Sequence, residues 1–162
     1  EFRRVLFRSV VNIYLPASKT GIKERIIDDT EVKHGECSGK GTVLVMDDDE
    51  DLRKILERIL NRIGYSTVVT ANSREAFSAF IEAEKNEPFS TVFLDMTIPG
   101  DMGGKEVIKN LLILRPSLKA VAISGYSDDP VMADPERFGF AAGLRKPFLK
   151  DEIIEALKKV EN

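Results

Sequence analysis

The chain has 162 residues, of which 43% are hydrophobic and 31% charged, an ordinary composition for a globular domain with a hydrophobic core. The net charge of −3 argues against nucleic acid as the main partner. No apolar run is long enough to span a membrane, so we expect no membrane contact by this segment. A single cysteine and a single histidine exclude a disulfide framework and a metal cluster of those residues.

The N-terminal part of the chain differs in character from the rest. Residues 10–15 alternate between two faces and stop at a proline, which is typical of a strand. Residues 18–41 are rich in Lys, Glu, Asp and Gly, so we interpret them as a flexible linker. The sequence therefore predicts three parts: an N-terminal piece (1–17), the linker, and a folded domain (42–162).

From residue 42 onward, strand and helix patterns alternate five times. The expected strands are 43–46, 66–70, 91–94, 120–123 and 142–145. Apolar residues at three- and four-residue spacing predict helices over 52–63, 76–81 with Asn72 or Ser73 as N-cap, 104–114, 130–138 and 151–160. Such alternation is typical of an α/β fold, with a parallel sheet covered by helices on both faces.

Polar side chains follow four of the expected strands. They are Asp47, Asp48 and Asp49 after the first strand, Asp95 after the third, Ser124 after the fourth and Lys146 after the fifth. Because the carboxyl ends of parallel strands share one edge of the sheet, we expect these groups to converge. Crowded carboxylates raise one another's pKa, and a hard cation such as Mg²⁺ relieves the repulsion. A carboxylate can also attack phosphorus, with a metal, a lysine and a hydroxyl to neutralise charge, which favours phosphoryl transfer.

Each of these residues also has a purely structural interpretation. The acids 49–51 satisfy free N–H groups in the first turn of a helix, and this is the interpretation we favour for them. Taken alone, Asp95 or Ser124 would equally begin a turn, and Lys146 would equally be a solvated lysine. Only their joint placement at strand ends favours the chemical interpretation.

Four motifs occur in a fixed order in the second part of the chain. They are VLVMDDDEDLR (43–53), FLDMTIPGDMGG (93–104), AISGYS (122–127) and RKPF (145–148). With these motifs, residues 42–162 resemble a response-regulator receiver domain. The resemblance implies a flavodoxin-like (CheY-like) doubly wound sheet of five parallel strands, in the order 2-1-3-4-5, with helices on both faces.

The resemblance also implies phosphorelay signal transduction by a switch that is not a turnover enzyme. A histidine kinase or a histidine phosphotransfer domain would be the phosphodonor, and Mg²⁺ the cofactor. The implied roles are Asp95 as phosphoacceptor; Asp47, Asp48, Asp95 and the backbone carbonyl of Thr97 as Mg²⁺ ligands; Ser124 and Lys146 as contacts of the phosphoryl oxygens; and a cis bond between Lys146 and Pro147. One departure is Gly143, at a position where many receivers carry an aromatic switch residue.

The segment VVNIYLPAS (10–18) resembles the last strand of a histidine-kinase ATP-binding domain. Followed by a charged linker and a receiver, it implies the tail of a hybrid sensor histidine kinase. We therefore expect a cytoplasmic segment of a parent protein that can itself be anchored in a membrane.

A haloacid-dehalogenase-like phosphatase is the alternative interpretation. That family uses an Asp-x-Asp pair after its first strand, here Asp47 and Asp49. It has Thr or Val two residues after the second acid, where this chain has Asp51, and it leaves Asp95 without a role. A nucleotide-binding module is disfavoured because no glycine-rich phosphate loop follows the first strand.

Overall fold

The computed structural model describes residues 41–126 and 128–161. The strand predicted over residues 10–15 and the linker as far as residue 40 lie outside the described residues. The strands are β1 (Thr42–Met46), β2 (Ser66–Thr70), β3 (Thr91–Asp95), β4 (Lys119–Ser124) and β5 (Ala142–Arg145). The helices are α1 (Glu50–Arg62), α2 (Ser73–Ala83), α3 (Gly104–Leu114), α4 (Pro130–Ala133), the 3₁₀ helix η1 (Glu136–Phe138) and α5 (Lys150–Glu161).

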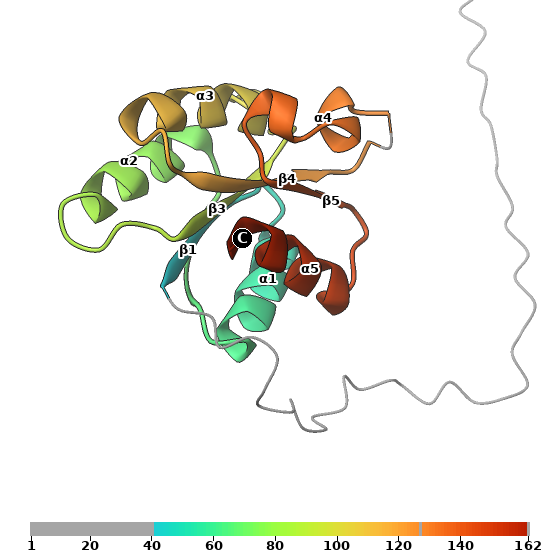
Figure 1. The fold of residues 1–162 in the computed structure, drawn as a ribbon, viewed down its shortest axis with the longest axis horizontal. Helices are drawn as coiled ribbons and strands as arrows, with labels where there is room; N and C mark the ends of the chain where they lie inside the picture. Colours follow the sequence, from blue (N-terminus) through green and yellow to red (C-terminus); the bar gives the residue numbers. More distant parts are fainter. Residues whose placement is uncertain (1–40, 127, 162) are drawn as a thin grey trace, which may run out of the picture. The chain divides into compact units, whose positions relative to one another are not determined.

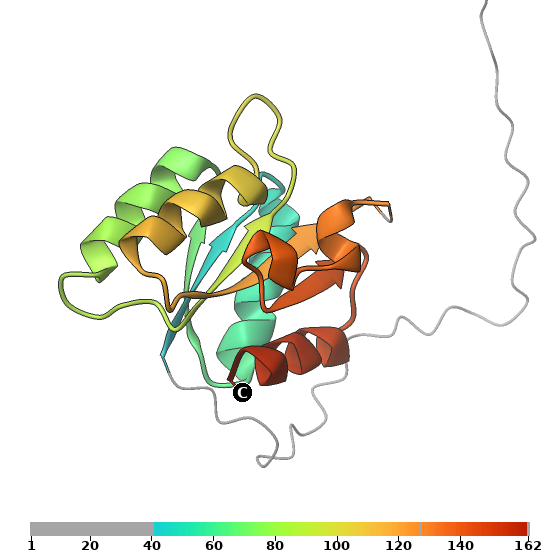
Figure 2. The ribbon, with the colours of Figure 1, turned by 45° about the horizontal axis from the view of Figure 1, so that its top comes forward.

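The five strands form one parallel sheet in the order β2-β1-β3-β4-β5. Helices α2, α3 and α4 cover one face of the sheet, and α1 and α5 cover the other (Figures 1 and 2). The predicted fold class, its strand order and its two helical layers are therefore confirmed. The parallel arrangement brings the carboxyl ends of all five strands to one edge.

The central strands are buried because both of their faces are covered. Successive side chains of a strand point to opposite faces. In β1, Leu44 and Met46 pack in the core on the side of α2 and α3, whereas Val43 and Val45 pack against α1 and α5. All of these side chains are fully buried, so the strand ends that carry polar groups are held by a rigid core.

The beginnings of α1 and α2 match the sequence expectations. The carboxylate of Asp49 accepts hydrogen bonds from the backbone N–H groups of Asp51 and Leu52, so Asp49 is the N-cap of α1. Asn72 caps α2 by accepting a hydrogen bond from the N–H of Glu75. The interpretation of Asp49 as a structural residue is supported by these contacts.

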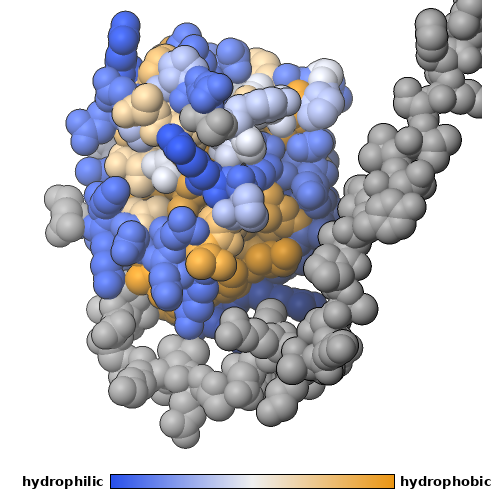
Figure 3. Space-filling model, turned by 90° about the vertical axis from the view of Figure 1, so that its right-hand side faces the viewer, coloured by the Kyte–Doolittle hydropathy of each residue, from blue (hydrophilic) through white to orange (hydrophobic). Residues whose placement is uncertain are grey.

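Not every apolar residue of the helical patterns belongs to the core. Ile55 in α1 is 49% exposed and Ile81 in α2 is 51% exposed. The buried face of each helix is therefore narrower than the spacing of apolar residues in the sequence indicates. On the side of the molecule that carries α4 and β5, hydrophilic side chains cover most of the surface and hydrophobic ones gather in its lower part (Figure 3). Within the described ranges, none of the helices is both long and apolar enough to pass through a membrane.

The single helix predicted over residues 130–138 is wrong. The chain instead forms α4, which ends at Ala133, and the separate 3₁₀ turn η1. Pro135 has no N–H to donate and disfavours helical geometry at the preceding Asp134, whose φ of −145° and ψ of 76° leave the helix. The proline therefore shortens α4 to about one turn.

Candidate functional site

The carboxyl ends of β1, β3 and β5 bring two acids and a lysine into contact. Nζ of Lys146, just after β5, lies 2.8 Å from Oδ2 of Asp47 and 2.8 Å from Oδ2 of Asp95. The ammonium donates a hydrogen bond to Asp95. One cation thus joins two of the sequence-predicted acids, which come from different strands.

The acids of this edge differ in burial. Asp47 is fully buried and Asp95 is 4% exposed, whereas Asp48 lies on the surface. One carboxylate oxygen from each of the three lies within 4.8 Å of the others. The edge of the sheet therefore offers three carboxylate oxygens as possible metal ligands, and of the three acids only Asp48 is exposed to solvent.

Burial and neighbouring charge shift the pKa values at this site. Burial raises the pKa of Asp95 and the Asp47 carboxylate raises it further, so that these effects outweigh the hydrogen bond from Lys146. Burial alone would lower the pKa of Lys146, but its contacts with Asp47 and Asp95 outweigh burial and raise it. The ammonium therefore stays charged, and two carboxylates share its single positive charge.

The two oxygens of the Asp47 carboxylate have different partners. Oδ1 accepts a hydrogen bond of 2.9 Å from the N–H of Asp49. Oδ2 is fully buried, and its partner is the Lys146 ammonium at 2.8 Å, which also serves Asp95. A buried carboxylate oxygen of this kind, beside two further carboxylates, fits a hard divalent cation such as Mg²⁺.

The backbone around Asp47 is fixed by contacts from two directions. Its N–H donates to the carbonyl of Thr70 at 3.2 Å, which continues the pairing of β1 with β2. Its carbonyl accepts a hydrogen bond of 2.6 Å from Nη1 of Arg53 in α1. Sequence reasoning missed Arg53, although its place one and a half turns after the acidic cluster was a usable signal.

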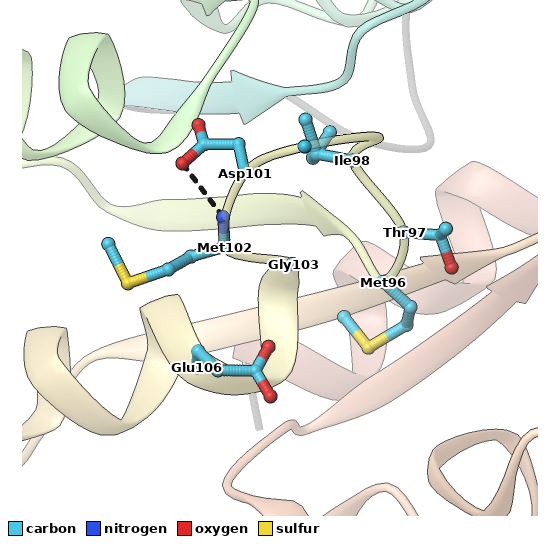
Figure 4. A pocket seen from close by; sticks show the side chains of 8 residues that line it. Met96, Thr97, Ile98, Asp101, Met102, Gly103 and Glu106 are labelled. Atoms are coloured by element: carbon cyan, nitrogen blue, oxygen red, sulfur yellow. Dashed lines mark hydrogen bonds between the residues drawn. The ribbon is translucent and has the colours of Figure 1, made fainter.

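The loop between β3 and α3 follows Asp95, and its residues line a pocket (Figure 4). The N–H of Thr97 lies 3.5 Å from Oδ1 of Asp95. Asp101 ties this loop to the start of α2, because its carboxylate accepts hydrogen bonds of 2.7 Å from both the N–H and the hydroxyl of Ser73. These bonds lower the pKa of Asp101. Sequence reasoning missed this residue.

A pocket of about 680 Å³ opens beside the loop and is lined by Thr97, Asp101 and Glu106, among others.

Ser124 ends β4 and is buried, and its contacts lie within the following loop. Its hydroxyl lies 3.3 Å from Oδ2 of Asp129 and 3.5 Å from the carbonyl of Tyr126, and it accepts a hydrogen bond of 3.2 Å from the N–H of Tyr126. Ser124 therefore stands at the predicted edge, but in this structure it is engaged by the β4–α4 loop.

The backbone of Lys146 is held in place by a hydrogen bond to the end of β4. The N–H of Lys146 donates to the carbonyl of Ser124 at 2.8 Å, and the Lys146–Pro147 peptide bond is cis, as the resemblance implied. Together with the pairing of Ser124 and Arg145 in the sheet, this contact fixes the ends of β4 and β5 side by side.

The geometry does not support the phosphatase alternative. That alternative needs Asp47 and Asp49 to act together on a substrate, but Asp49 is exposed and its carboxylate caps α1. Asp95, which the alternative leaves without a role, shares the Lys146 ammonium with Asp47.

Comparisons with known proteins identify the family. Residues 43–158 match the model of the response regulator receiver domain. Over 117 residues the chain is 31% identical to sporulation initiation phosphotransferase F of Bacillus subtilis, covering 72% of this chain and 90% of that protein. Over 118 residues it is 34% identical to the transcriptional regulatory protein FixJ of Rhizobium meliloti, covering 73% of this chain but only 55% of that longer protein.

A solved structure gives the same result. The response regulator TrrA of Thermotoga maritima, in complex with Mg²⁺-BeF, superposes with a TM-score of 0.64 at 26% identity, covering 75% of this chain and 99% of that one. The order of strands, the acids and lysine at their ends, and the family match all agree. The chain therefore belongs to the response regulator receiver domain family, and it is a phosphorelay signalling domain with a CheY-like fold.

Proposed function

We propose that Asp95 accepts a phosphoryl group in a Mg²⁺-dependent reaction, and that the donor is a phosphohistidine of a histidine kinase or of a phosphotransfer domain. The observation that carries the proposal is the sharing of the single Lys146 ammonium between the carboxylates of Asp95 and Asp47, beside the third carboxylate of Asp48. This arrangement holds an acceptor carboxylate beside a fixed cation and leaves room for one more positive charge.

In the reaction, an oxygen of the Asp95 carboxylate attacks phosphorus and the bond from phosphorus to the donor nitrogen breaks. The product is an acyl phosphate, and the donor imidazole takes the bonding electron pair and leaves as a neutral ring when its other nitrogen carries a proton. Lys146 holds the acceptor carboxylate through its hydrogen bond and offers charge to the incoming phosphoryl oxygens. Since one molecule takes up one phosphoryl group, the domain acts as a switch and not as a turnover enzyme.

The Mg²⁺ ligands would be Asp47, Asp48, Asp95 and the backbone carbonyl of Thr97. Bound Mg²⁺ supplies positive charge that neutralises the phosphoryl oxygens as they approach the carboxylates. The contact of Asp101 with Ser73 supports this role, because it fixes the loop on which Thr97 stands. Relatives lend further support, since the TrrA structure contains Mg²⁺-BeF.

Incubation of the protein with acetyl phosphate and Mg²⁺, followed by intact mass measurement, tests the proposal. We expect the wild-type chain to gain one phosphoryl group that hydroxylamine removes, because hydroxylamine cleaves acyl phosphates. The absence of any gain would refute the proposed function.

The Asp48→Ala variant is expected to lose Mg²⁺ affinity by at least about tenfold, since loss of even an outer-shell partner has this effect. Its stability without metal should stay the same or rise, because Asp48 is exposed and adds only repulsion to the acidic cluster. Calorimetric titration with MgCl₂ and a thermal melt measure the two effects. Asp51→Ala removes an exposed acid from the first turn of α1 and is the matched control, for which we expect unchanged affinity. Equal Mg²⁺ affinities of wild type and Asp48→Ala would contradict the ligand assignment.

A further inference from the structure

The carboxylate of Asp101 joins the β3–α3 loop to the first turn of α2. Oδ2 accepts a hydrogen bond of 2.7 Å from the N–H of Ser73, and Oδ1 accepts one of 2.7 Å from its hydroxyl. Ser73 is the first residue of α2, so its N–H has no acceptor within the helix. Because Ser73 is 2% exposed, loss of the Asp101 carboxylate would leave two buried donors without this acceptor, which is unfavourable.

The same loop carries Thr97, and hydrogen bonds fix the backbone on both sides of this residue. Before it, the N–H of Met96 donates to the carbonyl of Ile123 in β4 at 2.8 Å. After it, the N–H of Asp101 donates to the carbonyl of Ile98 at 3.2 Å, and the Ile98 side chain is 7% exposed. Thr97 itself is exposed. The direction of its carbonyl therefore depends on the two fixed points, of which Asp101 secures the second.

The loop is attached to α2 where attachment to α3 would be the local solution. An acid close before a helix commonly caps that helix. The N-cap of α3 is Gly103, and within the described residues no side chain caps this helix. A Cβ atom on Gly103 would lie 2.1 Å from the carbonyl oxygen of Met96, so the returning half of the loop lies directly against the residue after Asp95. A shift of the loop at Asp101 would consequently reach the backbone of the site.

We propose that the contact between Asp101 and Ser73 is a positioning element of the metal site, which fixes the Thr97 carbonyl and thereby couples Mg²⁺ binding to the first turn of α2. The inference rests on the proposed function, in which Thr97 is a metal ligand. Asp101 is a positioning residue, because it acts through the loop and lies outside the proposed set of ligands. The coupling is reciprocal: the factor by which the contact strengthens Mg²⁺ binding is the factor by which bound Mg²⁺ strengthens the contact.

Calorimetric titration of the full chain with MgCl₂ separates the geometry of Asp101 from its charge. Asp101→Ala is expected to weaken Mg²⁺ binding about threefold to tenfold, the range that a single hydrogen bond spans. Asp101→Asn should bind almost as the wild type does. The amide oxygen can accept from the N–H of Ser73 while the amide nitrogen donates to the hydroxyl oxygen, so the contact persists without the charge. Equal losses in the two variants would show that only the charge matters and would overturn the inference.

Two further variants separate the contact from a general loosening of α2. Ser73→Ala should weaken Mg²⁺ binding in the wild-type background and have no further effect in the Asp101→Ala background, because the two residues form one contact. Glu75→Ala is the matched control. It removes another acid of the first turn of α2, whose carboxylate accepts from the N–H of Ala71 and from the side chain of Asn72. We expect its Mg²⁺ affinity to equal that of the wild type, and a loss as large as that of Asp101→Ala would contradict the proposal.

Amide hydrogen exchange, measured by NMR with and without Mg²⁺, tests the reciprocal effect, which a merely structural contact would not show. Exchange at the N–H of Ser73 should slow about threefold to tenfold when Mg²⁺ is added. The N–H of Glu75 is the internal reference, because its acceptor is the side chain of Asn72 at the start of the same helix, and we expect its exchange to stay the same. In Asp101→Ala the effect of Mg²⁺ on Ser73 should disappear.

The outcomes are distinguishable. Failure of the wild type to bind Mg²⁺ would overturn the proposed metal site and this inference together. Mg²⁺ binding and phosphoryl uptake by the wild type, with unchanged Mg²⁺ affinity in Asp101→Ala or with equal slowing of exchange at Ser73 and Glu75, would overturn the inference alone and leave the proposed function standing.

Discussion

The Asp95→Asn variant is expected to take up no phosphoryl group from acetyl phosphate and Mg²⁺, whereas the wild type takes up one. Asp95 is the acid at the end of β3, the central strand of the sheet, and Lys146 is hydrogen-bonded to it. An amide in its place is a poor nucleophile and forms no acyl phosphate. Intact mass before and after hydroxylamine measures the difference.

The same variant should fold at least as well as the wild type. The pKa of Asp95 is raised in the folded protein by burial and by Asp47, so the folded state favours its protonated form. Stability therefore falls as pH rises from the ordinary pKa of a carboxyl through the raised one, and the full penalty is present above the raised pKa. A neutral Asn removes the penalty while its side-chain oxygen can still accept from Lys146. Equal phosphoryl uptake by the two proteins would contradict the assignment of Asp95.

The Lys146→Met variant is expected to lose about 2–4 kcal/mol of stability at neutral pH without metal, a figure reduced from that of a fully buried ion pair because the Lys146 side chain is 25% exposed. Without the ammonium, the carboxylates of Asp47 and Asp95 remain in the core with no cation between them. The pKa of Asp95 should then rise further, since burial and Asp47 already raise it and the opposing contact is lost.

Urea unfolding at neutral pH without metal measures this loss. Lys119→Met, which removes an exposed lysine at the start of β4, is the control, and we expect it to change stability little. Added Mg²⁺ should restore part of the stability of Lys146→Met, because it supplies the missing charge to the same oxygens. A Lys146→Met protein as stable as the wild type would show that the two acids do not need this cation.

The sequence by itself determined the α/β class, the five strands and the convergence of Asp47, Asp95 and Lys146. Strand and helix patterns arise from the local alternation of apolar and polar residues, and a parallel sheet then places every strand end at one edge. The cis bond before Pro147 and the strand order came from the motifs' resemblance to a family, and the structure confirms both. The meeting of Asp47, Asp95 and Lys146 was predictable because each of them ends or follows a strand.

The tertiary structure alone decided the contacts between residues far apart in the chain. Asp101 meets Ser73 across 28 positions, and no local pattern marks either as the other's partner. The break in the helix predicted over residues 130–138 followed from Pro135, but the packing of Met132 on Gly143 required the distance between α4 and β5. The contact between Oδ2 of Asp47 and the Lys146 ammonium also depended on where the lysine side chain came to lie. Such facts depend on differences of a few tenths of an ångström in the distances between packed side chains, and periodicity and composition carry no information about these distances.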